Sequence, residues 1–319
     1  MSSYKIVVLD GYTENPGDLS WEALSQLGTL TLYDRTAPSE VLERIKAAEI
    51  VLTNKVVLDR SIITHSPNLR YIGVLATGYN VVDLEAAKER AIIVTNIPSY
   101  SSQAVAQFTF ALLLEICHNV GQHSREVFNG RWQTSKDFCF WVAPLIELAG
   151  KTMGIIGYGK IGRATAQIAQ AMGMRVVVNN PSPVHDNSVE SLFIDELLAQ
   201  SDVISLHCPL TEQTREIIRA ETIEKMKDGV ILLNTGRGQL INEGDVAEAL
   251  KRGKIYAAGV DVVSQEPIRH DNPLLGAPNC FITPHIAWAT YESRSRLMEI
   301  AIANVRGFIE GKIQNQVNL

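Results

Sequence analysis

Short apolar runs alternate with amphipathic segments along the first third of the chain. The apolar runs predict five β-strands, at residues 5–9, 29–33, 50–53, 71–74 and 92–95. Segments with apolar residues at helical spacing lie among them, at residues 19–27, 39–47 and 84–89. Strands that alternate with helices favour a parallel sheet that is covered by helices on both faces.

A second series of strands and helices follows a break at residues 96–102. A strongly apolar helix is predicted at 104–117, and six strands are predicted at 152–156, 175–178, 203–207, 230–234, 256–260 and 280–283. Six strands are what a complete dinucleotide-binding sheet requires. The last predicted helix, 291–309, lies beyond that sheet, so we expect it to pack on the first domain. We therefore predict that residues 1–99 and 286–319 form a substrate domain, that residues 100–285 form an inserted dinucleotide-binding domain, and that the reaction site lies in the cleft between the two.

A glycine-rich turn joins the first strand of the second series to a helix. Residues 153–162 read Met-Gly-Ile-Ile-Gly-Tyr-Gly-Lys-Ile-Gly. Gly157 allows a tight turn, Gly159 lets the backbone approach phosphates, and Gly162 lets the helix pack close to the strand. The free N–H groups and the dipole of the helix N-terminus favour an anion there. This order predicts a pyrophosphate site formed by Gly157, Tyr158, Gly159, Lys160, Ile161 and Gly162, against the alternative of a connector that binds nothing.

Composition narrows the classes of protein. The chain has 319 residues, 46% hydrophobic and 20% charged, with a net charge of −6, which is typical of a soluble globular protein and argues against nucleic acid or a membrane as the partner. The first residues lack the pattern of a signal peptide, and the longest apolar runs are too short for a membrane span. Four cysteines lack paired spacing, so we expect no metal site, no disulfides and a cytoplasmic protein.

Polar side chains follow three predicted strands of the second domain, where parallel sheets bind their ligands. Arg237 lies between glycines, Glu266 precedes a proline, and His285 ends the segment Thr-Pro-His. Arginine can bind a carboxylate with two hydrogen bonds, histidine can exchange a proton with an alkoxide, and glutamate can orient the imidazole. Together they suit hydride transfer on a 2-oxo acid. Taken singly, Arg237 also fits a surface loop, Glu266 a turn before proline, and His285 a core histidine.

These motifs, in this order and over nearly the whole length, resemble the D-isomer-specific 2-hydroxyacid dehydrogenases. The shared segments are the glycine turn, His-x-Pro-Leu-Thr at 207–211, Asn-Thr-x-Arg-Gly at 234–238, Asp-Val-x-x-x-Glu-Pro at 261–267 and Thr-Pro-His at 283–285. The resemblance implies an α/β fold with two domains, a flavodoxin-like substrate domain and an inserted Rossmann domain. It also implies that Arg237, Glu266 and His285 are the catalytic set.

The same resemblance assigns further binding residues. It implies that Asp261 holds the nicotinamide carboxamide and that Cys208 and Pro209 border the adenine. Cofactor contacts are also expected from Thr235, Gly236, Asn180 and His285. The family's substrate loop corresponds to residues 75–80, where Thr77 and Gly78 would bind the substrate carboxylate through their N–H groups. Lys55 would add positive charge or be only a solvated lysine, and Trp288 would line the substrate pocket or pack at the hinge.

One position departs from the family's pattern. The family commonly carries an aspartate after the second strand of the nucleotide domain, where it binds the ribose hydroxyls of NAD, and this chain has Asn180. A neutral amide can bond the hydroxyls but does not repel a 2′-phosphate, and no arginine follows to pair with one. We expect NAD as the cofactor, with NADP not excluded.

Several stretches are similar to the glycerate dehydrogenase, or hydroxypyruvate reductase, branch, namely residues 76–80, 100–107 and 285–289. The prediction is reduction of hydroxypyruvate to D-glycerate, with glyoxylate as a second substrate. Two alternatives stay open: a broad or D-lactate-type 2-oxo-acid reductase, and a non-catalytic, corepressor-like protein that senses the cofactor. Because the family commonly dimerises through the region of helix 104–117 and the long, aromatic-rich loop that is predicted after it up to Trp141, a homodimer is expected.

Overall fold

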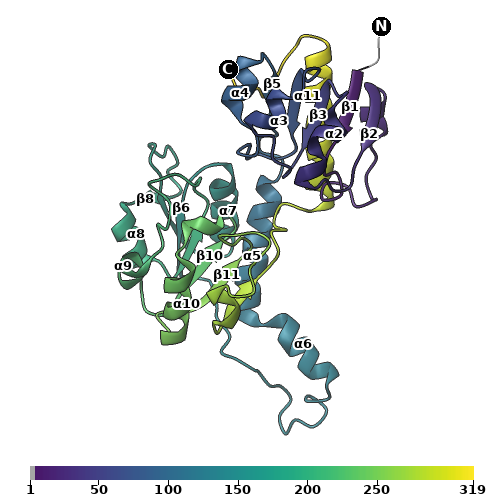
Figure 1. Cartoon of the computed structure of the whole chain (residues 1–319). Helices are drawn as coiled ribbons and strands as arrows, with labels where there is room; N and C mark the ends of the chain where they lie inside the picture. Colours follow the sequence, from purple (N-terminus) through teal and green to yellow (C-terminus); the bar gives the residue numbers. More distant parts are fainter. Residues whose placement is uncertain (1–3) are drawn as a thin grey trace. The chain divides into compact units, whose positions relative to one another are not determined.

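The computed structural model describes residues 4–319, which form two compact units (Figure 1). The first unit runs to Ser101 and is completed by Ala289–Leu319, and the second is Ser102–Trp288. The predicted domain boundaries, after residues 99 and 285, lie close to these limits, and residues 1–3 of the predicted first domain lie outside the described part. The chain thus leaves the first unit once and returns to it once.

The first unit contains a five-stranded parallel sheet in the order β2-β1-β3-β4-β5. Its strands are β1 (Tyr4–Val8), β2 (Gly28–Leu32), β3 (Ile50–Thr53), β4 (Tyr71–Val74) and β5 (Ile93–Thr95). Its helices are α1 (Glu22–Ser25), α2 (Val41–Ile45) after a 3₁₀ turn at Pro38–Glu40, α3 (Arg60–Thr64), α4 (Leu84–Glu89) and α11 (Tyr291–Ile309). This strand order is that of flavodoxin-like folds.

The C-terminal helix α11 packs on the sheet of the first unit. The ring of Phe308 lies 4.9 Å from that of Tyr71 on β4, measured between centroids. The side chain of Asn318 accepts the N–H of Val94 on the edge strand β5 and donates to the carbonyl of Ile92, which precedes that strand. Burial of apolar rings and of paired backbone groups therefore ties residues from the two ends of the chain into one core.

The second unit contains a seven-stranded parallel sheet in the order β12-β11-β10-β9-β6-β7-β8. Its strands are β6 (Thr152–Ile156), β7 (Arg175–Asn179), β8 (Glu190–Ser191), β9 (Val203–Leu206), β10 (Val230–Asn234), β11 (Ile255–Val260) and β12 (Cys280–Ile282). The order is that of a Rossmann sheet with one further strand. The prediction of six strands missed β8, because two residues are too few to show a period.

Six helices accompany this sheet, together with 3₁₀ turns at Gly238–Leu240 and Pro273–Gly276. They are α5 (Ser102–His118), α6 (Val120–Phe128), α7 (Lys160–Ala171), α8 (Ile194–Gln200), α9 (Ala220–Glu224) and α10 (Glu243–Arg252). The sequence predicted a loop where α6 lies. Figure 1 shows α6 and the loop after it extending away from the sheet of this unit, and Asn119 at the start of α6 has a left-handed φ of 49°.

The apolar helix α5 is buried against the sheet of the second unit. Leu112 and Ile116 of α5 lie so close to β11 that a Cβ on Gly259 would stand 3.1 Å from Leu112 Cβ. Within residues 4–319, no single helix has both the length and the apolar character to cross a bilayer, although α5 and α6, bent by 54° at their junction, pass that test as a pair.

Candidate active site

The backbone of the turn after β6 packs closely on the segment that follows β9. Gly157 has a φ of +96°, and a Cβ on it would lie 2.4 Å from the backbone nitrogen of Cys208 and 2.6 Å from the carbonyl carbon of His207. No other residue type fits both that conformation and that space. Glycine is therefore required here by the fold of the unit itself.

The next two glycines differ in what surrounds them. A Cβ on Gly162 would lie 2.2 Å from the carbonyl oxygen of Gly157, so α7 can approach the turn only with glycine there. Gly159 instead faces open space, since nothing lies within 4 Å of its ideal Cβ position. It is also the N-cap of α7, and its end of the helix has no side-chain cap. The first amides of α7, at Lys160 and Ile161, thus lie at an uncapped helix N-terminus next to open space, and such an N-terminus favours an anion.

Asn180 follows β7 and lies beside the same turn. Its Oδ1 accepts the N–H of Tyr158 at 2.9 Å, and its Nδ2 donates to the carbonyl of Ser182 at 3.0 Å. The amide therefore shapes the glycine turn, and an oxygen has a second lone pair with which to accept a ribose hydroxyl.

A carboxylate that the sequence analysis did not single out lies near this turn. Asp186 Oδ2 accepts the hydroxyl of Tyr158 at 2.7 Å. Hydrogen bonds from Ser188 and from Tyr158 lower the pKa of Asp186 to about 2, while burial and the bond to Asp186 raise the pKa of Tyr158 to about 12. The loop after β7 thus carries a fixed negative charge, and no motif in the sequence pairs these two residues.

The residues after β9 are uncharged where they contact the glycine turn at Gly157. Burial lowers the pKa of His207 to about 4, and its Nε2 lies 2.8 Å from Ser205 Oγ. Burial raises the pKa of Cys208 to about 11, so its thiol keeps its proton and is a poor nucleophile. Pro209 follows directly on the surface.

The turn after β10 presents Arg237. Asn234 spans the turn, because its Nδ2 donates to the carbonyl of Arg237 at 2.9 Å and its Oδ1 accepts the N–H of Gly236 at 3.1 Å. Thr235 is tied to α5 by a 3.0 Å bond between its hydroxyl and that of Thr109. The guanidinium of Arg237 is exposed, with Nη1 donating to the carbonyl of Gly236 at 2.8 Å.

A close backbone contact brings this turn next to the segment after β11. A Cβ on Gly238 would lie 1.9 Å from the carbonyl carbon of Val263 and 2.4 Å from the nitrogen of Ser264. Gln239 adds a bond from Nε2 to the carbonyl of Ser264 at 2.7 Å. Because Glu266 lies on the same segment, the contact fixes the loops of Arg237 and Glu266 side by side.

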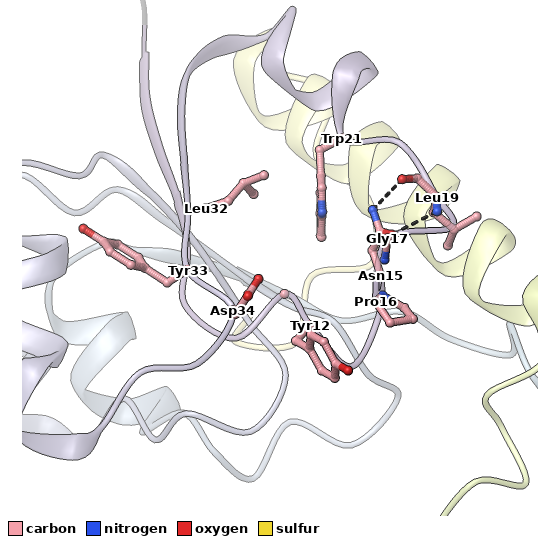
Figure 2. Close-up of a pocket in the computed structure, with 10 residues that line it drawn as sticks. Tyr12, Asn15, Pro16, Gly17, Leu19, Trp21, Leu32, Tyr33 and Asp34 are labelled. Atoms are coloured by element: carbon pink, nitrogen blue, oxygen red, sulfur yellow. Dashed lines mark hydrogen bonds between the residues drawn. The ribbon is translucent and has the colours of Figure 1, made fainter.

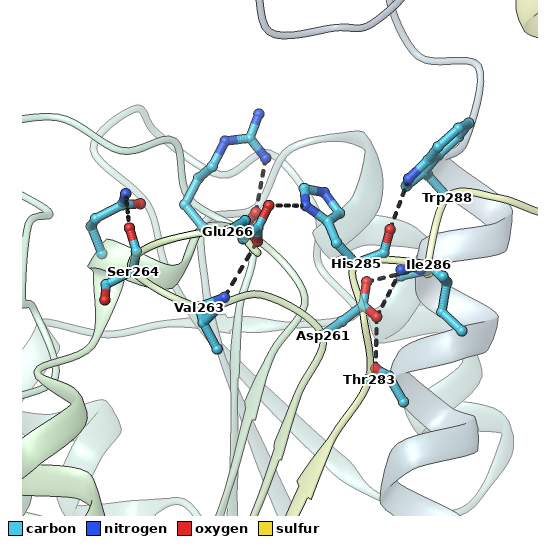
Figure 3. Close-up of polar contacts among 12 residues, drawn as sticks. Asp261, Val263, Ser264, Glu266, Thr283, His285, Ile286 and Trp288 are labelled. Carbon is cyan, nitrogen blue, oxygen red and sulfur yellow. Dashed lines mark hydrogen bonds and ion pairs between the residues drawn. The ribbon is translucent and has the colours of Figure 1, made fainter. Parts of the chain in front are cut away.

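The imidazole of His285 and the carboxylate of Glu266 meet directly. His285 Nδ1 lies 2.7 Å from Glu266 Oε2, and Figure 3 shows the two side chains pointing toward each other from the segments after β12 and β11. His285 has a left-handed φ of 56°, and its N–H donates to the carbonyl of Asp261 at 2.8 Å. Both side chains are partly exposed. With Nδ1 bonded to the carboxylate, Nε2 is the ring nitrogen left to exchange a proton.

Asp261 and Trp288 hold the turn that carries His285 (Figure 3). The buried carboxylate of Asp261 accepts the hydroxyl of Thr283 at 2.6 Å and the N–H groups of Ile286 and Ala287 at 2.9 and 2.8 Å. Trp288 Nε1 donates to the carbonyl of His285 at 3.0 Å. The observed role of both residues is therefore to position the histidine, while contacts of Asp261 with nicotinamide and of Trp288 with substrate stay predictions.

The candidates in the first unit lie at the carboxyl ends of its strands. Thr77, after β4, donates its hydroxyl to the carbonyl of Ile97 at 2.9 Å and accepts Asn96 Nδ2 at its own carbonyl at 2.8 Å. Gly78 continues the same loop. After β3, the exposed Lys55 donates its backbone N–H to Asp10 Oδ2 at 2.6 Å. Their binding of substrate remains a prediction.

A pocket of about 360 Å³ lies in the first unit, and none of the candidate residues from the sequence is among those that line it (Figure 2). It is lined mainly by residues of the loop after β1 and of the end of β2, among them Tyr12, Trp21, Tyr33 and Asp34. The sticks in Figure 2 show that the loop is braced from within by Asn15, whose Nδ2 donates to the carbonyl of Leu19 at 2.7 Å.

Comparisons with known proteins show what this chain is similar to. A family model described as D-isomer specific 2-hydroxyacid dehydrogenase, NAD binding domain, matches residues 110–287. A hydroxypyruvate reductase of Blautia hydrogenotrophica is 56% identical over 98% of this chain and 99% of its own. A glycerate dehydrogenase of Methylorubrum extorquens is 41% identical over 89% of this chain and 90% of its own. The structure of a D-lactate dehydrogenase from Aquifex aeolicus, complexed with NAD and lactic acid, superposes with a TM-score of 0.85 at 30% identity and covers 99% of both chains.

Proposed function

Since this chain belongs to the family of D-isomer-specific 2-hydroxyacid dehydrogenases, we propose that it is the reductase that converts hydroxypyruvate to D-glycerate, with glyoxylate as a second substrate. The high identity to a hydroxypyruvate reductase over nearly the whole chain supports this choice of substrate. The observation that carries the proposal is the 2.7 Å bond between His285 and Glu266, at the same sheet edge as the turn of Arg237.

In this proposal each residue of the set has one task. The guanidinium of Arg237 binds the carboxylate of the 2-oxo acid, since its planar fork matches two carboxylate oxygens. His285 donates a proton from Nε2 to the carbonyl oxygen at C2 as that oxygen gains charge. Glu266 keeps the ring in the tautomer and orientation that this requires. The nicotinamide cofactor, when bound, supplies the hydride.

The glycine turn is the part that fits NAD. The open space at Gly159 and the uncapped start of α7 suit the pyrophosphate, and the second lone pair of Asn180 Oδ1 suits a ribose hydroxyl. The anionic Asp186 and the neutral Asn180 offer no cation for a 2′-phosphate, which supports NAD over NADP.

Steady-state kinetics with hydroxypyruvate, glyoxylate and pyruvate, each with NADH and NADPH, test this function. The expected result is the highest kcat/KM with hydroxypyruvate and NADH, followed by glyoxylate. A higher value with pyruvate would instead identify a D-lactate-type reductase. Cofactor binding without turnover of any of the three would contradict the proposal and favour a cofactor sensor.

The proposal includes a homodimer in the cytoplasm. Aromatic residues of α6 and of the loop after it, Phe128, Trp132, Phe138 and Trp141, are exposed in the single chain. Several large apolar side chains exposed on one segment are typical of a protein interface. All four cysteines are free thiols, which is compatible with a reducing compartment.

A further inference from the structure

The loop between β1 and α1 carries a carboxyl group that is sealed from solvent. Glu14 has no exposed surface, although its neighbours Thr13 and Asn15 are not buried. Its Oε2 accepts the hydroxyl of Thr13 at 3.0 Å, and its Oε1 contacts Nδ2 of Asn54, which follows β3. Burying an ionised carboxylate costs free energy unless a cation or several donors compensate it.

The charges around Glu14 do not favour its anion. Asp10, two residues after β1, has the same negative charge, and this charge raises the pKa of Glu14. Arg294 of α11 reaches the loop, but its Nη1 donates to the backbone carbonyl of Glu14, and its guanidinium forms a bidentate pair with Asp18 at 2.7 and 2.6 Å. Lys55, beside Asn54, has an exposed side chain. The positive charge of Arg294 is therefore compensated mainly by Asp18, and Glu14 contributes the smallest of the interactions that raise the pKa of Arg294.

Asn54 has the complementary deficiency. It is 5% exposed, and its Oδ1 is the one buried side-chain atom in residues 4–319 that has no hydrogen-bond partner. A buried acceptor without a donor is unfavourable. The hydrogen bonds to the carboxyl group of Glu14 come from the neutral side chains of Thr13 and Asn54, while Asn54 Oδ1 lacks a donor although the two side chains touch.

We propose that Glu14 is a neutral carboxylic acid that pairs with the amide of Asn54, and that this pair positions the turn after β3 for substrate binding. A protonated carboxyl has one O–H donor, which serves Asn54 Oδ1, while Asn54 Nδ2 donates to the other carboxyl oxygen. Both deficiencies are removed by one proton. Burial first, and then the charge of Asp10, raise the pKa of Glu14 to about 8, which agrees with a proton held at neutral pH.

The pair is one of two supports of the same turn. Asp10 accepts the backbone N–H groups of Asn54, Lys55 and Val56 at 2.8, 2.6 and 3.1 Å, and so fixes the backbone. The pair with Glu14 fixes the side chain of Asn54, because the carboxyl group of Glu14 contacts Asn54 Nδ2. The turn presents Lys55, the candidate source of positive charge for the substrate of the proposed function, and the functional half of the inference rests on that function. Loss of the proton from Glu14 would leave its carboxylate next to that of Asp10, and the repulsion would remove the support of the Asn54 side chain.

The first test measures stability against pH and does not depend on activity. An unfolded glutamate loses its proton near pH 4.5, and Glu14 in the folded chain keeps it to about pH 8. The folded state then binds more protons in this window, so the stability of the wild type falls as pH rises through it. Glu14→Gln keeps the neutral pair, with its amide in place of the acid, and cannot titrate. The difference in Tm between Glu14→Gln and wild type is therefore expected to grow from pH 5 to pH 8.

A matched control makes the same substitution at an exposed glutamate. Glu22→Gln on α1 should keep a constant Tm difference from wild type over this range. Infrared spectra at neutral pH should show a protonated carboxyl band in the wild type that Glu14→Gln lacks. A constant Tm difference for Glu14→Gln, or the absence of that band, would overturn the acid–amide pair even if the enzyme turns over as proposed.

The second test separates positioning from mere stability. KM for hydroxypyruvate, measured at saturating cofactor, should rise several-fold in the wild type as pH passes 8 and stay flat in Glu14→Gln. The pH profiles of kcat should run parallel in the two proteins, since both keep His285. If the Tm difference grows with pH but KM depends on pH in the same way in the wild type and in Glu14→Gln, the pair stabilises the fold and does not position the turn for substrate. Absence of hydroxypyruvate turnover in both would count against the proposed function, while the Tm and infrared results would still decide the pair.

Discussion

At the scale of single residues, the site depends on how firmly His285 is held. Its left-handed backbone costs roughly 1–3 kcal/mol, which neighbouring bonds must offset. Glu266 holds the ring, the carbonyl of Asp261 holds the N–H, and Trp288 holds the carbonyl. Strain of this kind persists at functional sites because the surrounding structure over-determines the conformation. The histidine is thus fixed at its ring and at both backbone groups.

Replacing His285 by alanine tests the proton donor. The change should lower kcat for hydroxypyruvate by roughly 10²–10⁴-fold, because general acid catalysis contributes about that factor. The Kd for NADH, measured by fluorescence titration, should change little. His65→Ala, at an exposed histidine of the first unit, should leave both values as in the wild type. An unchanged kcat in His285→Ala would remove the proposed acid.

Replacing Asn180 by aspartate tests the choice of cofactor. A carboxylate keeps the acceptor that Tyr158 N–H uses and adds a charge that repels a 2′-phosphate. The ratio of kcat/KM for NADH over NADPH should rise by roughly tenfold, which corresponds to about 1.4 kcal/mol of repulsion. Asn187→Asp, which adds the same charge at an exposed site of the same loop, is the control. Equal ratios in the two variants would show that Asn180 does not face the ribose.

At the scale of elements, the carboxyl ends of β10, β11 and β12 act as one unit. These strands are neighbours in the sheet, so the segments after them emerge side by side. Gly238 is the point of closest approach between the first two, and the carboxylate of Asp261 joins the second to the third. The relative positions of Arg237, Glu266 and His285 therefore depend on backbone contacts as much as on the residues themselves.

Gly238→Ala tests this dependence. The new Cβ would overlap the backbone of Val263, so the two segments must separate. Overpacking of this kind costs roughly 1–3 kcal/mol, and kcat/KM should fall together with Tm. Gly244→Ala in α10 is the matched control, since its nearest neighbour would be 3.4 Å away and alanine favours a helix. Wild-type kcat/KM in Gly238→Ala would show that the contact does not position the site.

At the scale of the whole molecule, α6 and the loop after it carry large aromatic side chains that the single chain leaves exposed. Phe128 and Phe138 are each 89% exposed, and Trp132 and Trp141 of the same segment are 52% and 64% exposed. Burial of such side chains in a second copy would contribute on the order of 1.5–3 kcal/mol each. This surface is the basis of the proposed homodimer.

Charges placed on that surface test the dimer. Light scattering should give the wild type twice the chain mass of 35.1 kDa and give the double variant Phe128→Asp, Phe138→Asp the mass of one chain. Desolvating two carboxylates in an apolar interface is unfavourable, which is the reason for the expected dissociation. Phe193→Asp, at an equally apolar side chain that is 81% exposed elsewhere in the second unit, should remain a dimer. A monomeric wild type would contradict the assembly.

The sequence by itself determined the features that depend on local chemistry. Buried parallel strands must be apolar runs, a phosphate-binding turn needs glycines at fixed spacing, and α11 shows its helical period, so these elements and the family were predicted correctly. The two-residue β8 and the helix α6 were missed, the first because it is too short to show a period and the second because the aromatic-rich segment up to Trp141 predicted one long loop.

Only the tertiary structure decided how distant residues are used. It showed that Asp261 and Trp288 hold His285, that Gly238 is the meeting point of two segments, and that Asp186 bonds Tyr158. It also enclosed Glu14 next to Asn54, forty positions away. Contacts of this kind arise when strands far apart in the chain become neighbours in a sheet, and burial then sets the protonation of the groups it encloses. No pattern of neighbouring residues carries that information.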